Sequence, residues 1–103
     1  MKVIVKIMQL STDLTIVADD AKNTLLVNEK IANFNPQVFI DRISVITSRW
    51  APRYTNNTII DGEEFLVKFI DNKFSHAFVG KNSFPPNYGD FKQLIAEVLR
   101  PCN

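Results

Sequence analysis

Residues 61–100 constrain the fold of this chain more than any other stretch. Two segments in it, at positions 65–70 and 74–78, alternate side chains with the period of two expected for strands. After a loop with two prolines, a helix is predicted to begin at the capping residue Asn87 and to end before Pro101. Its apolar residues recur at three- and four-residue spacing, and they are Phe91, Leu94, Ile95, Val98 and Leu99. The stretch therefore predicts a hairpin covered by an amphipathic helix.

The two strands of this hairpin are expected to join through a tight turn at Asp71 and Asn72. The turn matters because it fixes which residues lie opposite one another. The predicted pairs are Phe69 with Phe74, Val67 with His76, and Phe65 with Phe78. All six side chains would then share one aromatic face, which the helix can cover.

The first third of the chain predicts three more strands. Apolar residues occupy the odd positions from 3 to 7, which places them on one face of a strand and leaves the other face in water. Two further runs, at 14–18 and 24–28, flank a polar turn and are expected to pair as a hairpin. Residues 58–60 precede Asp61 and Gly62, a strong turn signal, and predict another strand.

A first helix is predicted after residue 35. Asn35 is a good cap, Pro36 suits the first helical position, and Phe34 can pack on Phe39. The helix should end near Trp50 or Ala51, because Pro52 disfavours helical backbone in the residue before it. Residues 51–57 are then expected to form a loop.

Together these elements predict a single α+β domain over residues 1–103. We expect an antiparallel sheet of about five or six strands in the chain order β-β-β-α-β-β-β-α. Both helices should pack on one face of the sheet, because both are amphipathic and the sheet offers one aromatic face. At 103 residues the chain is long enough to bury a core without disulfides or metals.

Charge and cysteine content exclude several classes of protein. The formal net charge of +1 gives no general attraction to nucleic acid or anionic membranes. The single cysteine, Cys102, excludes a disulfide framework within the chain and a zinc site that needs several cysteines. Residues 1–10 read as a strand rather than a signal peptide, and no apolar run approaches the roughly 20 residues that span a bilayer. We therefore expect a cytoplasmic protein that needs no cofactor or metal.

No catalytic motif is evident. His76 is the only histidine, and the predicted register places it between two phenylalanines, where a structural role is favoured over a catalytic one. The acidic pairs Asp19-Asp20 and Glu63-Glu64 could suggest a carboxylate dyad. Successive strand residues point to opposite faces, however, so solvated turn charge is the preferred interpretation. The sequence thus predicts a protein that is not an enzyme.

Three candidate binding surfaces remain. Arg49, Arg53 and Tyr54 surround Trp50, and arginine with aromatic residues can stack on nucleic-acid bases or form a protein interface. Trp50 itself is expected in the core. The loop from Phe84 to Tyr88 could present either aromatic ring, or both rings could clamp the loop onto the sheet. The third surface is acidic and consists of Asp19, Asp20, Asp61, Glu63 and Glu64.

The pattern Asp61-Gly62 followed by Gly80-x-Asn82-x-Phe84-Pro85-x-Asn87-Tyr88-x-x-Phe91 resembles one found in small bacterial proteins of unassigned function. The size and layout are similar to immunity proteins that neutralise a toxin. This resemblance implies a non-enzymatic protein that binds a toxin domain and covers its active site, with the acidic turns facing a basic cleft. The alternative is a nucleic-acid-binding module that uses Arg49, Arg53 and Tyr54.

Overall fold

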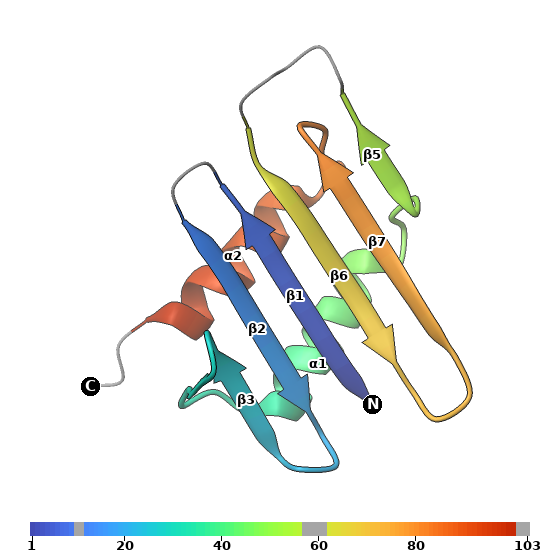
Figure 1. Cartoon of the computed structure of the whole chain (residues 1–103). Coiled ribbons are helices and arrows are strands. Elements are labelled where there is room, and N and C mark those ends of the chain that lie inside the picture. The colour runs from blue at the N-terminus through green and yellow to red at the C-terminus, as the bar shows by residue number, and fades with distance from the viewer. Residues whose placement is uncertain (10–11, 57–61, 101–103) are drawn as a thin grey trace.

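The computed structural model describes residues 1–9, 12–56 and 62–100. In chain order its elements are β1 (Lys2–Met8), β2 (Asp13–Asp19), β3 (Thr24–Val27), β4 (Lys30–Ile31), α1 (Pro36–Thr47), β5 (Arg53–Thr55), β6 (Glu64–Ile70), β7 (Ser75–Lys81) and α2 (Tyr88–Leu99). Figure 1 shows one sheet with both helices behind it. The predicted α+β fold, with both helices on one face, is confirmed.

Within the described ranges the sheet has seven strands in the order β4-β3-β2-β1-β6-β7-β5. The count is slightly above the expected five or six, because two short strands were not predicted. One is β4, and the other is β5, which lies in the predicted loop 51–57. Strand β5 runs parallel to β7, so the sheet is mixed rather than purely antiparallel. The predicted strand at 58–60 and the candidate residue Asp61 lie outside the described residues.

The core fills the space between the sheet and the two helices. The sheet contributes Val3, Val5, Ile7, Ile16, Ala18, Leu25, Phe65, Val67 and Phe69, and the helices contribute Phe39, Ile40, Ile43, Phe91, Leu94, Ile95 and Val98. Alternation along the strands assigns these side chains to the covered face, as predicted for β1 and β6. Leu99, which was predicted on the apolar stripe of the second helix, is 47% exposed.

Helix α1 begins as predicted. The Oδ1 atom of Asn35 accepts a hydrogen bond from the backbone N–H of Val38 at 3.0 Å, and Pro36 is the first helical residue. Phe34 meets Phe39 edge to face with ring centroids 6.5 Å apart, which confirms the expected apolar contact across the helix start. The cap and this contact together fix where the chain enters the helix.

The two helices are joined through Trp50 and Asn87. Helix α1 ends at Thr47, earlier than predicted, but Trp50 is only 7% exposed and belongs to the core, as expected. Its Nε1–H donates to Oδ1 of Asn87, and Nδ2 of Asn87 donates to the carbonyl of Ile46 at 2.7 Å. Asn87 is the N-cap residue of α2, yet its side chain makes no capping hydrogen bond there. It ties the end of α1 to the start of α2 instead.

The β6–β7 hairpin has a different register from the predicted one. The observed pairs are Phe69 with His76, Val67 with Phe78, and Phe65 with Gly80. The strands are joined by the four residues 71–74, with the N–H of Asp71 donating to the carbonyl of Phe74 at 2.9 Å. The predicted two-residue turn at Asp71 and Asn72 is therefore wrong. The slip is an even number of residues, so the aromatic residues of both strands remain on the covered face.

Candidate functional site

Glu63 lies at the centre of a polar cluster where β1, β6 and α2 meet. Its carboxylate accepts hydrogen bonds from Nε2 of Gln9, the hydroxyl of Tyr88 and Nζ of Lys92, the last at 2.7 Å. Gln9 follows β1, Glu63 precedes β6, and the other two residues lie in the first turns of α2. We call these four residues the Glu63 cluster.

The electrostatics of the Glu63 cluster favour a structural role. Burial opposes the charge on Glu63, but hydrogen bonds from Lys92, Tyr88 and Gln9 outweigh it and hold the pKa of Glu63 below its ordinary value. Burial and the neighbouring carboxylate of Glu63 raise the pKa of Tyr88 far above its ordinary value, so this phenol stays protonated. A carboxylate that stays charged and a phenol that stays neutral make a poor acid–base pair near neutral pH.

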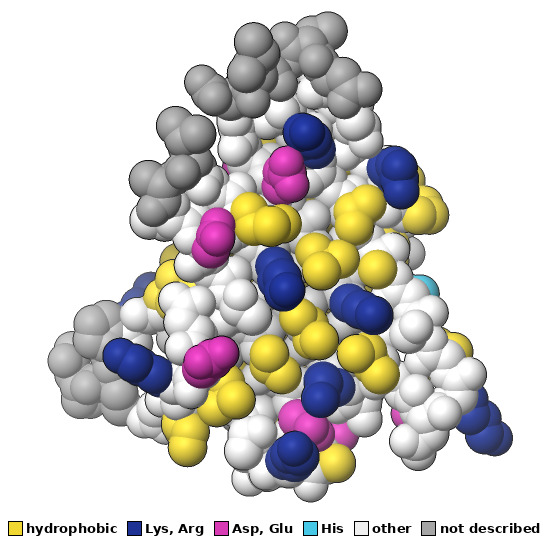
Figure 2. Space-filling model, viewed as in Figure 1, with side chains coloured by type: hydrophobic (Ala, Val, Ile, Leu, Met, Phe, Trp, Pro, Cys, Tyr) yellow, Lys and Arg dark blue, Asp and Glu magenta, His cyan; other side chains and the backbone are white. Residues whose placement is uncertain are grey.

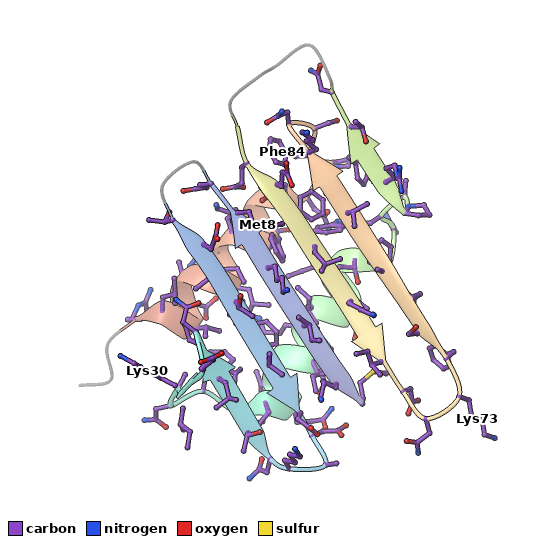
Figure 3. All side chains as sticks on the ribbon, viewed as in Figure 1. Met8, Lys30, Lys73 and Phe84 are labelled. Atoms are coloured by element: carbon purple, nitrogen blue, oxygen red, sulfur yellow. The ribbon has the colours of Figure 1, made fainter. Side chains whose placement is uncertain are left out.

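The loop from Phe84 to Tyr88 is held by stacked rings. Phe84 stacks on Tyr88 with centroids 4.6 Å apart and on Phe65 at 6.2 Å. Tyr88 also packs against Trp50 and Phe91. In Figure 3, Phe84 lies near the same end of the sheet as Met8. This arrangement matches the interpretation that both aromatic residues clamp the loop onto the sheet. Phe84 keeps 41% of its surface exposed, so only part of this candidate surface faces solvent.

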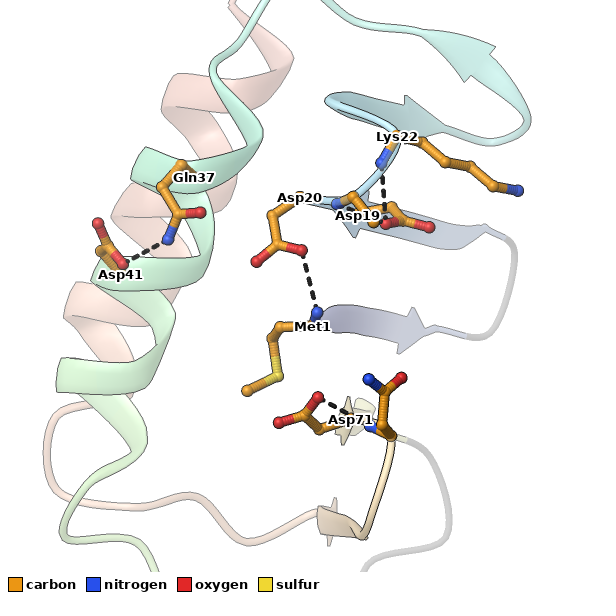
Figure 4. Close-up of polar contacts among 9 residues, drawn as sticks. Met1, Asp19, Asp20, Lys22, Gln37, Asp41 and Asp71 are labelled. Carbon is orange, nitrogen blue, oxygen red and sulfur yellow. Dashed lines mark hydrogen bonds and ion pairs between the residues drawn. The ribbon is translucent and has the colours of Figure 1, made fainter.

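The carboxylates of Asp19 and Asp20 lie at the turn that follows β2 and have partners within the fold (Figure 4). Asp19 is buried and accepts from the backbone N–H groups of Ala21 and Lys22 at 3.0 and 3.2 Å. Asp20 pairs with the amino group of Met1 at 3.0 Å, and this contact raises the pKa of that amine. The two residues organise the turn and do not form a carboxylate dyad.

The predicted acidic surface is divided between two ends of the sheet. Asp19 is the last residue of β2, whereas Glu64 is the first residue of β6 and Glu63 precedes it. Because both strands pair with β1, the register places Asp19 and Glu64 at opposite ends of the strands. Their partners in β1, Lys2 and Met8, are six residues apart, which is roughly 20 Å along the strand. Glu64 lies opposite Lys81 and is 3.8 Å from its Nζ. The four described carboxylates of this set therefore do not form one surface, and each has a partner within the fold.

The arginine–tyrosine cluster is also divided. Arg53 and Tyr54 are neighbours in β5 and point to opposite faces of the sheet. Tyr54 is half-buried against the core, and its hydroxyl oxygen accepts from the N–H of Ala51 at 2.7 Å. Arg53 is exposed on the other face, and Arg49 is exposed just after α1. Arg53 is therefore the member of this set that can join a wider surface.

His76 is exposed, although the predicted register placed it between two phenylalanines on the covered face. It lies in β7 and stacks on Phe69 at 5.0 Å and on Phe74 at 6.0 Å. Phe74 belongs to the turn rather than the strand, because of the register slip described above.

The described residues contain no group of three or more His, Cys, Asp or Glu side chains that could hold a metal ion. In the described ranges, neither helix is long and apolar enough to cross a membrane.

The front of the sheet has no helix over it, and we call this surface the open face (Figures 1 and 2). Its positions follow from the strand register. The apolar members are Ile4, Met8, Val17, Leu26, Ile31, Leu66, Ile70, Ala77 and Val79. A sheet face that meets only water usually alternates to polar residues, so this many apolar side chains is unusual. We predicted that this side of β1 faces water, although the apolar residues Ile4 and Met8 lie on it.

Cations lie between the apolar side chains of the open face, as Figure 2 shows. They are Lys2, Lys6, Lys68, Lys81 and Arg53. Only Lys81 has an acidic partner among the described residues, in Glu64. Asp13 is an exposed acidic residue on this face, and no basic side chain among the described residues pairs with it. The open face is therefore apolar with an excess of positive charge, although the whole chain is nearly neutral.

No protein-family model matches the chain, and no match was found among curated proteins or solved structures.

Proposed function

We propose that this chain is a non-enzymatic protein-binding domain and that the open face is its binding surface. The observation that carries the proposal is the row of Ile4, Val17 and Leu26 across neighbouring strands, with Leu66 and Val79 beside it and no helix above. These five side chains are half-buried, and contiguous apolar surface patches are typical of interaction sites. The charged groups of the Glu63 cluster and of the β2–β3 turn are instead used within the fold.

The charge of the open face specifies the kind of partner. Lys2, Lys6, Lys68 and Arg53 would repel a second copy of the same face, so self-association through it is disfavoured. They favour a partner whose own apolar patch is rimmed by Asp and Glu. Such complementary charge speeds association and aligns the two surfaces, while the aliphatic side chains provide the buried contact area.

Nucleic-acid binding is less well supported. Proteins that bind single strands on a sheet stack bases on exposed aromatic rings, and the open face carries aliphatic residues at its apolar positions. The ring of Tyr54, which the nucleic-acid alternative requires beside Arg53, packs on the opposite side of the sheet. Arg53 and the lysines of the open face can then contact phosphates, but the described residues of this face place no aromatic ring beside them as a stacking platform.

Toxin neutralisation is the biological role that we propose for this binding. The support is the resemblance carried by Asp61-Gly62 and by the pattern from Gly80 to Phe91. We expected acidic turns to cover a basic cleft, but these carboxylates have internal partners. The open face therefore replaces them in our proposal as the surface that meets the toxin.

Site-specific photocrosslinking in the native cells tests this proposal. A photoreactive amino acid replaces Leu66 on the open face or, as a matched control, Val45, which is 74% exposed on α1. We expect one specific protein adduct at Leu66 and none at Val45. The captured protein, expressed alone, should arrest growth, and co-expression of this chain should restore it.

An adduct at Val45 and none at Leu66 would move the interface to the helices. A specific open-face adduct with a protein that is harmless when expressed alone would retain protein binding and contradict toxin neutralisation.

A further inference from the structure

A second candidate site lies on the side of the sheet opposite the open face, independent of the proposed function. It is a hollow of about 300 Å³ where the last turns of α1 approach the β6–β7 hairpin. Five of the lining side chains are aromatic, and they are Trp50, Phe69, Phe74, His76 and Phe78. The volume is at the lower limit of small-molecule sites, so it suits one ring rather than a large ligand.

The aromatic rings that line the hollow range from buried to exposed. Trp50 and Phe69 are buried at 7% and 4% exposure, whereas Phe74 is 54% exposed. Trp50 meets Phe78 edge to face at 5.9 Å, and His76 meets the same ring edge to face at 5.6 Å. A further ring can therefore extend an existing set of edge-to-face and stacked contacts, the arrangements that aromatic pairs prefer.

The opposite wall supplies hydrogen-bond acceptors. Ser44, Thr47 and Ser48 line the hollow from α1. Each hydroxyl donates its proton to a helix carbonyl, Ser44 to Ile40 at 2.7 Å and Ser48 to Val45 at 2.8 Å. Thr47 does the same toward Ile43, at 2.9 Å. A hydroxyl has one donor and two acceptor positions, so these oxygens can still accept a hydrogen bond. A ligand that brings its own O–H or N–H donor matches this wall.

The lining is uncharged apart from Met1, whose amino group pairs with Asp20, and it includes the imidazole of His76. We propose that the hollow binds a neutral aromatic ring carrying a hydrogen-bond donor, and specifically the phenol of a tyrosine side chain presented by another protein. A tyrosine side chain and a free small phenol share the aromatic ring and its hydroxyl. They differ because only the tyrosine brings a peptide backbone to the hollow.

Three small probes separate the required features. p-Cresol has the aromatic ring and the donor, 4-methylanisole has the aromatic ring without the donor, and 4-methylcyclohexanol has the donor on a saturated ring. Trp50 is the only tryptophan, so its fluorescence reports the hollow directly, and amide NMR shifts of residues 74–78 provide a second readout. We expect p-cresol to bind at millimolar concentration and the other two probes to bind more weakly.

Variants then locate the site. Phe74→Ala should weaken p-cresol binding about fivefold, since one aromatic neighbour is lost. Phe74 is exposed, so the variant should remain folded, and Val45→Ala, outside the hollow, should bind like the wild type. Equal binding of all three probes, or no effect of Phe74→Ala in a folded protein, would overturn the proposal. N-acetyl-tyrosinamide tests the source: binding at least as tight as that of p-cresol supports a tyrosine side chain, and its exclusion would overturn that source.

Discussion

At the residue scale, Glu63 and Glu64 are neighbours in the chain with different surroundings. Glu63 keeps 14% of its side chain exposed and accepts hydrogen bonds from three residues on two other segments. Glu64 is 45% exposed and has a single, distant partner in Lys81. Hydrogen bonds to a partly buried charge contribute more to stability than an exposed ion pair does. The two residues therefore form a matched pair for mutation.

We expect Glu63→Gln to lower the free energy of unfolding by about 2 kcal/mol, because an amide cannot accept from all three donors. Glu64→Gln should change it by less than about 1 kcal/mol. Chemical denaturation of both variants beside the wild type measures the difference. Similar losses in the two variants would contradict a specific role for the Glu63 cluster.

The effect of Glu63 should also depend on pH in a defined direction. Its pKa is lower in the folded protein than in the unfolded chain, so its contribution is complete above the ordinary glutamate pKa of about 4.3. As pH falls through that value and then through the lower folded-state pKa, the contribution is lost. The difference in unfolding free energy between wild type and Glu63→Gln should shrink over this acidic range. A difference that stays constant would show that charge is not its source.

At the scale of elements, the β3–β4 and β6–β7 turns explain why the register of a hairpin is harder to predict than its buried face. A two-residue hairpin turn needs positive φ at both central residues in type I′ and at the first of them in type II′. Asn28 and Glu29 meet this condition, with φ of 48° and 71°, and they join β3 to β4 directly. Asp71 and Asn72 are not among the described residues with positive φ, so β6 and β7 need the longer connection. Composition alone did not distinguish these cases, whereas the buried face followed from the alternation.

The corrected register makes Gly80, opposite Phe65, a test of the hairpin. A Cβ atom at Gly80 would lie 2.0 Å from Cε1 of Phe65, whose side chain is 1% exposed. Gly80→Ala should destabilise the protein by about 2 kcal/mol through overpacking. Gly89→Ala is the control, because nothing lies within 4 Å of its added Cβ and the residue is helical. It should be neutral or stabilise by up to about 1 kcal/mol. Thermal unfolding of both variants decides, and a neutral Gly80→Ala would contradict the observed packing.

At the scale of the whole molecule, the sequence predicted the layers better than the surfaces. Amphipathic periods identify what is buried, and the core of the sheet and helices followed from them. The candidate site did not follow, because the open face assembles side chains from strands far apart in the chain, such as Lys6 of β1 and Lys68 of β6. The acidic residues looked available in the sequence, yet Asp20 and Glu63 have partners that only the tertiary structure reveals.

The central claim, that the open face binds an acidic protein partner, is tested most directly by charge reversal with a matched control. Lys6→Glu with Lys68→Glu reverses two cations on the open face, and Lys22→Glu with Lys73→Glu makes the same change in net charge at exposed turns. Binding kinetics of both folded double variants are measured with the crosslinked partner at low and high salt. We predict that the open-face variant associates more slowly and raises Kd at least about tenfold at low salt, with a smaller effect at high salt. Equal Kd values for the two double variants would contradict the claim.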